Sequence, residues 1–234
     1  MSDEGERSGR SRGPSRYSVF VGIAFLALIA IAAFNTFRSE EGGLLGAGGA
    51  EPGTELPEFA VPELIGGADA DANVFQNGCE TSERPCPADA RRTSACAVDL
   101  PNVIRVCDLF NRPLVISFWF SDPDDCPPTQ DHVDAAARRY RGKVNFLSLA
   151  VRGDREQLAE LVRERGWALP IGWDRDGAVS NLYSVGVCPT LAFVLPGGVL
   201  SEALIGVDEL EPARLQRSIE RLVKASDAAV RDSR

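Results

Sequence analysis

The sequence predicts an α/β domain in which helices flank a central sheet. Residues 113–120 and 144–151 are short, apolar and rich in branched and aromatic side chains, which is typical of buried strands. A helical apolar period follows each of them, and this alternation of strand and helix indicates parallel strands. Residues 190–195 and 199–205 predict two more strands, joined across Pro196-Gly197-Gly198.

The first of these helices is expected to begin at Cys126. Pro127 and Pro128 suit the first turn of a helix, where a missing N–H is tolerated. Apolar side chains then recur at helical spacing, at Val133, Ala136, Ala137 and Tyr140. This places the sulfur of Cys126 at a helix N-terminus.

Two further helices are predicted from their first residues and their apolar faces. Asp154 and Gln157 form a capping box ahead of one helix, and Pro212 opens the last one. Their buried faces are expected to hold Leu158, Leu161 and Val162 in the first case and Leu215, Ile219, Leu222 and Val223 in the second.

The N-terminal part predicts a membrane anchor. Residues 18–37 carry no charge and are long enough to cross a bilayer, and four arginines precede them within the cytoplasmic tail 1–17. The positive-inside rule then predicts a single-pass protein of the cell membrane with its C-terminal part outside the cytoplasm. A cleaved signal peptide is the rival interpretation, but its apolar region is usually shorter and ends in small residues.

A linker and a covalently braced insertion are expected before the main strands. Residues 38–55 are rich in glycine and predict a flexible linker, and the domain itself is expected to span 56–226, with a tail at 227–234. Residues 56–64 suit an edge strand, and 103–107 a second strand. Between them, residues 66–102 show no helical or strand period and predict a cysteine-rich loop.

The six cysteines and the acidic charge restrict the class of protein. The net charge of −9 argues against nucleic acid as a partner. Cysteines outside the cytoplasm pair and stay paired, and no Cys-x-x-Cys is present to indicate zinc. Cys79, Cys86, Cys96 and Cys107 are the structural disulfide candidates, with three pairings open. No cofactor or metal is predicted.

These elements and several motifs together resemble the thioredoxin superfamily, and in particular its membrane-anchored TlpA/ResA-like (redoxin) branch. The motifs are Pro57-Glu58-Phe59, Pro62-Glu63-Leu64, residues 112–119 (Arg-Pro-Leu-Val-Ile-Ser-Phe-Trp), Trp173-Asp174-Arg175-Asp176-Gly177, Tyr183-Ser184-Val185-Gly186-Val187 and Cys188-Pro189-Thr190. The resemblance implies a thioredoxin-like fold over residues 56–224, with a central mixed sheet flanked by helices and an N-terminal hairpin extension. It also implies a cis bond at Pro189, which brings Cys188 beside the active-site loop.

The active-site loop departs from the family pattern. An ungapped alignment sets Pro123 at the first cysteine of the family's Cys-x-x-Cys and Cys126 at the second. A shifted alignment makes Cys126 the first cysteine and Thr129 the lost one. The stretch 122–127 is also similar to the Cys-Pro-Asp-x-Cys-Pro motif of Sco copper proteins, but Asp122 replaces one ligand there and His132 lies on the helix, so copper is not expected.

Cys126, Cys188 and Pro189 are therefore the candidate catalytic residues. A helix N-terminus lowers the pKa of a cysteine thiol and favours the nucleophilic thiolate, whereas Asp122, Asp124 and Asp125 work against it. Cys126 is taken as the nucleophile, Cys188 as its possible resolving thiol, and Pro189 as part of the client groove. His132, Trp119 and Trp173 are expected to play no catalytic role.

Three functions remain open. The first is a membrane-anchored, extracytoplasmic thiol-disulfide oxidoreductase that acts on protein thiol or disulfide clients and takes electrons from an unidentified donor. The second is a redox-inactive scaffold or binding domain. The third is a thiol peroxidase, which is disfavoured because Pro123 stands where peroxiredoxins carry a threonine.

Overall fold

The computed structural model describes residues 25–29, 44–45, 51–68, 94–121, 126–206 and 211–232. The chain divides into two compact units, residues 1–41 and 42–234. In the first unit, residues 25–29 are helical. Within the described ranges no helix combines the length and the apolar character that crossing a membrane requires, and most of the predicted segment 18–37 falls outside those ranges.

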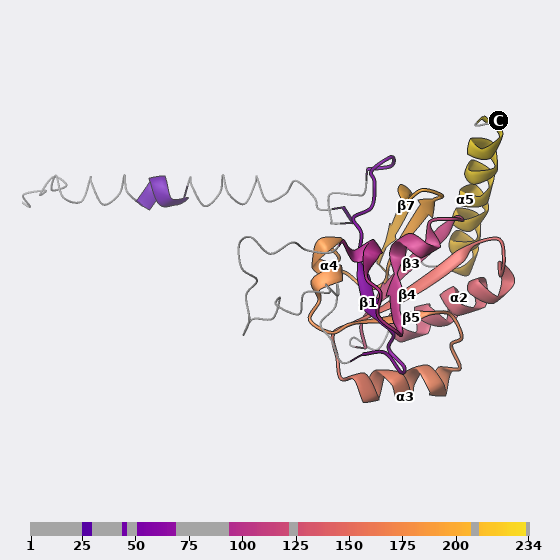
Figure 1. Ribbon diagram of the computed structural model, residues 1–234. Helices are drawn as coiled ribbons and strands as arrows, with labels where there is room; N and C mark the ends of the chain where they lie inside the picture. The colour runs from indigo at the N-terminus through magenta and orange to yellow at the C-terminus, as the bar shows by residue number, and fades with distance from the viewer. Residues whose placement is uncertain are drawn as a thin grey trace, which may run out of the picture. The chain divides into compact units, whose positions relative to one another are not determined.

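A five-stranded mixed sheet forms the centre of the second unit, with the strand order β5-β4-β3-β6-β7 (Figure 1). Its strands are β3 (Leu114–Trp119), β4 (Asn145–Val151), β5 (Ile171–Asp174), β6 (Thr190–Leu195) and β7 (Val199–Ile205). β3, β4 and β5 run parallel, whereas β6 is antiparallel to β3 and β7 to β6. The predicted parallel strands and closing hairpin are thus confirmed.

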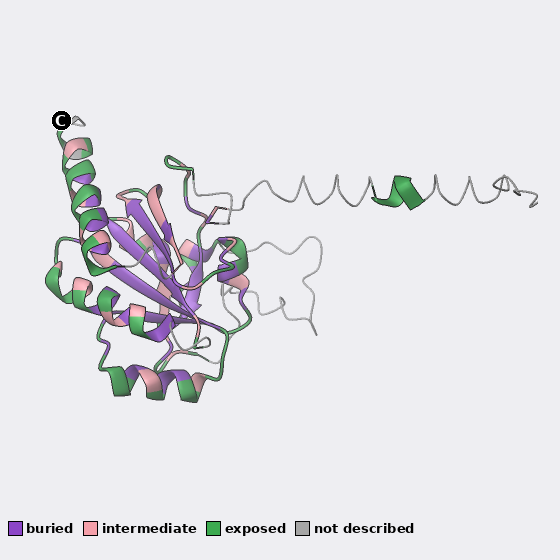
Figure 2. Ribbon diagram, turned by 180° about the vertical axis from the view of Figure 1, so that it is seen from behind, coloured by how far each residue is buried: buried purple, intermediate pink, exposed green. Residues whose placement is uncertain are grey.

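Helices pack on both faces of this sheet, because its strands are apolar on both sides. They are α2 (Cys126–Arg139), α3 (Arg155–Arg165), α4 (Ala178–Leu182) and α5 (Pro212–Asp232). Val115 and Trp119 of β3 join one apolar core with residues of α2, α3 and α5. Ile116 and Phe118 face the opposite core, which includes Tyr183. Figure 2 shows the buried central strands and the exposed outer faces of the helices.

A small second sheet precedes the central one. β1 (Ala60–Pro62) pairs antiparallel with β2 (Val103–Arg105), and most of the predicted insertion 66–102 lies outside the described residues. The strand expected over 103–107 is shorter than predicted, because the chain turns into a 3-10 helix, η2 (Val106–Leu109). The N–H of Val106 donates to the carbonyl of Phe59, which fixes this turn against the start of β1.

The start of α3 agrees with the prediction. Asp154 caps the helix by accepting hydrogen bonds from the N–H groups of Glu156 and Gln157, both at 3.0 Å. Gly166 ends it in the left-handed conformation, with a φ of 67°. A capping residue and a terminal glycine therefore defined this helix from local chemistry alone.

β5 and α4 were not predicted as elements. Asp174 joins them: its carboxylate accepts from the N–H groups of Val179 at 3.0 Å and Ser180 at 2.8 Å, and so caps α4 from the end of β5. The Asp174 side chain is fully buried, and this desolvation raises its pKa above the ordinary value. A four-residue strand followed by a five-residue helix is too short for a periodic pattern to reveal.

Candidate functional site

Cys126 lies at the point where the chain leaves the sheet and enters α2. β3 ends at Trp119, and α2 begins with Cys126, as predicted. The N–H of Phe120, the first residue after β3, donates a hydrogen bond to Sγ of Cys126 at 3.3 Å. The Cys126 side chain has an exposed fraction of 0% and belongs to the core between the sheet and the helices. Its sulfur is thus held by a main-chain donor at a helix N-terminus.

Cys188 lies in the loop between α4 and β6. The peptide bond from Cys188 to Pro189 is cis, as expected from the resemblance. Two hydrogen bonds hold this loop: the Thr190 hydroxyl donates to the carbonyl of Val187 at 2.7 Å, and the N–H of Gly206 donates to the carbonyl of Pro189 at 2.8 Å. The loop is therefore tied to β7 as well as to β6.

The register of two strands brings the two cysteines together. Thr190, the first residue of β6, lies opposite Phe118 of β3 in the antiparallel pair. Residues before Thr190 therefore continue beside residues after Phe118, which places Cys188 next to the start of α2. The two cysteines form a disulfide with a Cα–Cα distance of 5.9 Å and a sequence separation of 62. Their expected proximity is confirmed, while their catalytic roles remain predictions.

Two buried polar residues beneath this site, Ser117 and Gln130, were not predicted from the sequence. Gln130 lies one turn after Cys126 on the same face of α2, and its Oε1 accepts from the hydroxyl of Ser117 at 3.1 Å. Nε2 of Gln130 has no protein partner in the part of the chain that the structure describes. A glutamine amid polar neighbours such as Asp131 carries no signal of burial, so only the packing of α2 on β3 reveals it.

The other residues considered in the sequence take structural positions. Trp119 is buried and packs edge-on against Trp167, with ring centroids 5.2 Å apart. Trp173 is also buried and lies under the guanidinium of Arg155, 5.0 Å from the ring centroid. His132 is exposed and lies on α2, the helix on which it was expected. Asp122, Asp124 and Asp125 lie outside the described residues, so their effect on Cys126 stays a prediction.

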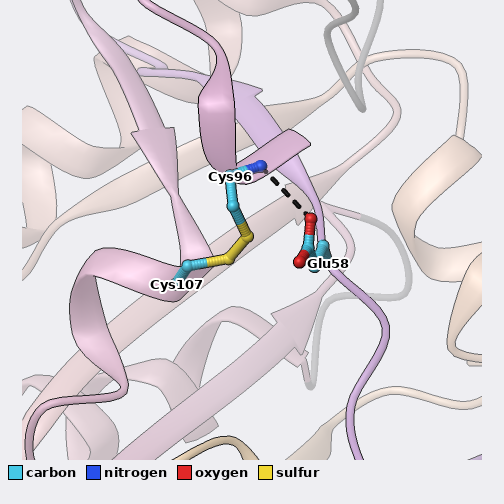
Figure 3. A group of neighbouring side chains, drawn as sticks. All are labelled: Glu58, Cys96 and Cys107. Atoms are coloured by element: carbon cyan, nitrogen blue, oxygen red, sulfur yellow. Dashed lines mark hydrogen bonds between the residues drawn. A yellow bond between two sulfur atoms is a disulfide. The ribbon is translucent and has the colours of Figure 1, made fainter. Parts of the chain in front are cut away.

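A second disulfide braces the small sheet. Cys96 of η1 (Ala95–Ala97) is bonded to Cys107 of η2 across 11 residues, with a Cα–Cα distance of 5.7 Å. Glu58 lies beside this bond, and one of its carboxylate oxygens accepts from the N–H of Cys96 at 3.4 Å (Figure 3). A carboxylate oxygen of Glu58 and both sulfurs lie within 4.8 Å of one another. The other structural candidates, Cys79 and Cys86, lie outside the described residues.

These three side chains are a potential set of metal ligands, since zinc binds thiolate and carboxylate groups. Both sulfurs are bonded to each other, however, and a disulfide sulfur is not the thiolate that zinc requires. The arrangement fits a protected structural bond better than a metal centre.

Comparison with known proteins identifies one relative in sequence and several similar structures. No protein-family model matches the chain. The thiol-disulfide oxidoreductase ResA of Oceanobacillus iheyensis is 25% identical over 114 residues, which is 47% of this chain and 59% of that protein. This chain therefore spans less than two thirds of the relative's length.

Solved structures show the same fold. A putative thiol:disulfide interchange protein DsbE from Chlorobium tepidum superposes with a TM-score of 0.55 at 14% identity, covering 74% of this chain and 98% of its own. A putative thioredoxin from Neisseria meningitidis gives a TM-score of 0.51 at 18% identity, covering 76% and 95%. The chain has a thioredoxin-like fold. The relative that it matches in sequence is a thiol-disulfide oxidoreductase.

Proposed function

We propose that this protein is a membrane-anchored, extracytoplasmic thiol-disulfide oxidoreductase that works without a Cys-x-x-Cys pair. The redox couple is the disulfide between Cys126 and Cys188. One observation carries the proposal: a cysteine at the N-terminus of α2 is bonded to the cysteine that precedes Pro189, in a fold whose relatives exchange disulfides. The lost local pair is replaced by one formed across the tertiary structure.

The surroundings of Cys126 support exchange at this bond. Disulfide exchange proceeds through a thiolate, and a thiolate is stabilised by hydrogen-bond donors and by the positive end of a helix. The N–H of Phe120 already points at Sγ of Cys126, which begins α2. When the bond opens, the charge left on this sulfur meets a donor that is in place beforehand.

The compartment follows from the sequence. Residues 18–37 are the proposed anchor, and the arginines in 1–17 keep the N-terminus in the cytoplasm. Clients and the electron donor would then meet the domain outside the cytoplasm. The test is labelling of intact cells with a membrane-impermeant maleimide, after mild reduction. Protection of Cys126 and Cys188 until the membrane is permeabilised would contradict this orientation.

The activity is tested by the dithiothreitol-driven reduction of insulin, followed by turbidity. The full chain should accelerate this reaction, and both Cys126→Ser and Cys188→Ser should abolish the acceleration, because each removes half of the couple. The matched control is the double variant Cys96→Ser with Cys107→Ser, which also loses one disulfide but should retain activity. Acceleration that survives both single variants would contradict the proposal.

A redox-inactive scaffold domain is the second candidate. It is favoured by the complete burial of Cys126 and by the 62-residue separation of the bond, which suits a structural staple. A scaffold predicts that the Cys126–Cys188 bond resists reduction as firmly as the Cys96–Cys107 bond. Mapping of the disulfides by peptide mass spectrometry during stepwise reduction separates the two functions.

A further inference from the structure

We propose that Cys188 is the cysteine that becomes covalently bonded to the client, and that Cys126 is the resolving cysteine. This inference rests on the proposed function and reverses the order expected from the sequence. It follows from the different surroundings of the two sulfurs, which the sequence does not show.

The first difference is access. In disulfide exchange the attacking sulfur approaches along the line of the S–S bond and forms its new bond with the nearer sulfur. Cys126 has an exposed fraction of 0%, whereas Cys188 is partly exposed. Its neighbour Val187 is 48% exposed, and Gly186 is exposed as well. The Cys188 side of the bond is therefore the more open to a client, whereas the core covers Cys126.

The second difference is the stability of the leaving group. Exchange is faster when the sulfur that leaves is the more stable thiolate. Attack on Cys188 releases Cys126, whose Sγ receives the hydrogen bond from the N–H of Phe120 at the start of α2. Attack on Cys126 would release Cys188, and among the described residues no group donates a hydrogen bond to that sulfur. Leaving-group stability thus also favours attack at Cys188.

The third difference is charge. The attacking group is an anion, so nearby carboxylates repel it. Asp125 directly precedes Cys126 in the chain, with Asp122 and Asp124 close before it. Residues 185–190, which surround Cys188, contain no ionisable side chain besides the cysteine itself. These carboxylates are expected to repel an anion that attacks Cys126. They also oppose the charge on a released Cys126 sulfur, so access and the hydrogen bond from Phe120 carry the inference.

The dithiol form reduces a client in two exchange steps. The Cys188 thiolate attacks one sulfur of the client disulfide, the client S–S bond breaks, and the first client thiolate leaves and takes a proton from water. The Cys126 thiolate then attacks Sγ of Cys188, re-forms the bond between them and releases the second client thiolate. The client gains two electrons and the protein loses two, and oxidation of a client dithiol is the reverse.

The test uses the full chain with single substitutions and glutathione disulfide as the probe. In Cys126→Ser the accessible Cys188 thiol should take up one glutathione and keep it, since the resolving thiol is absent. In Cys188→Ser the buried Cys126 thiol should react about tenfold more slowly or not at all. Intact mass at timed intervals gives both rates, and the same variants unfolded in urea are the control, where the two rates should become similar. A faster reaction in Cys188→Ser would overturn the inference.

A measurement on the unchanged protein covers the case in which a variant does not fold. The oxidised chain is mixed with excess glutathione, quenched in acid, alkylated and mapped by peptide mass spectrometry. Glutathione on Cys188 with alkylated Cys126 supports the inference. Glutathione on Cys126, or equally on both, overturns the order of attack but leaves the proposed function intact. A bond that stays closed overturns the proposed function and this inference with it.

Discussion

Reduction of the Cys126–Cys188 bond should lower the free energy of unfolding by much less than the loop-closure entropy of this cross-link predicts. The bond joins residues 62 apart, and in the chain-entropy treatment a cross-link of that span stabilises a fold by about 4 kcal/mol. A bond that serves only as a brace should contribute this full amount when the oxidised and reduced proteins are compared.

An exchanging bond should contribute less, because the folded protein also stabilises the reduced form. A hydrogen bond from the N–H of Phe120 to a charged Cys126 sulfur is worth about 1.5–3 kcal/mol, and the α2 N-terminus adds about 0.3–1 kcal/mol. Subtracting these from the cross-link leaves a difference of about 0–2 kcal/mol between the oxidised and reduced proteins.

The assay is guanidinium unfolding of the two forms, with peptide mapping to confirm that the Cys96–Cys107 bond stays closed in both. The control is the double variant Cys126→Ala with Cys188→Ala, which lacks both the cross-link and the thiolate and should be about 4 kcal/mol less stable than the oxidised protein. If the reduced protein is as unstable as this variant, the stabilised thiolate does not exist and the reasoning fails.

Three further predictions concern other residues of the domain. Glu58→Gln should speed the opening of the Cys96–Cys107 bond by dithiothreitol about fourfold at low salt, because the carboxylate repels the attacking thiolate, and an unchanged rate would exclude this shielding. Burial raises the pKa of Asp174, so the folded protein holds the proton of this carboxyl more tightly than the unfolded chain does. The free energy of unfolding of the wild type, relative to that of Asp174→Asn, should therefore fall as the pH rises from about 3.8 through the raised pKa. A difference in denaturant unfolding that stays flat or rises with pH would contradict this prediction. Tyr183→Phe should cost about 1–2 kcal/mol in the same assay, because the buried phenol donates to a main-chain carbonyl 2.8 Å away, and a neutral result would show that this carbonyl finds another donor.

Local chemistry explains which elements could be predicted. The apolar runs at β3 and β4 can only be buried, and Asp154 caps the first N–H groups of α3 within three residues of itself. By the same reasoning, Pro127 and Pro128 placed Cys126 at the start of α2. These signals depend on neighbouring residues alone.

Short elements and distant contacts could not be predicted in this way. β5 pairs with β4, and the carboxylate of Asp174 caps α4 from the end of β5. β2 ends early because the N–H of Val106 donates a hydrogen bond to the carbonyl of Phe59, far back in the chain. Each depends on a partner that is set by the packing of other elements. Residue type and spacing do not specify such a partner.

The sequence by itself determined that Cys126 begins a helix, that no second cysteine lies three positions from it, and that Cys188 stands before a proline. The tertiary structure decided that these two cysteines are bonded, that Cys126 is covered and that Cys188 is partly open. The physical reason is the β3–β6 register, which pairs Phe118 with Thr190 and carries two segments 62 residues apart to the same end of the sheet.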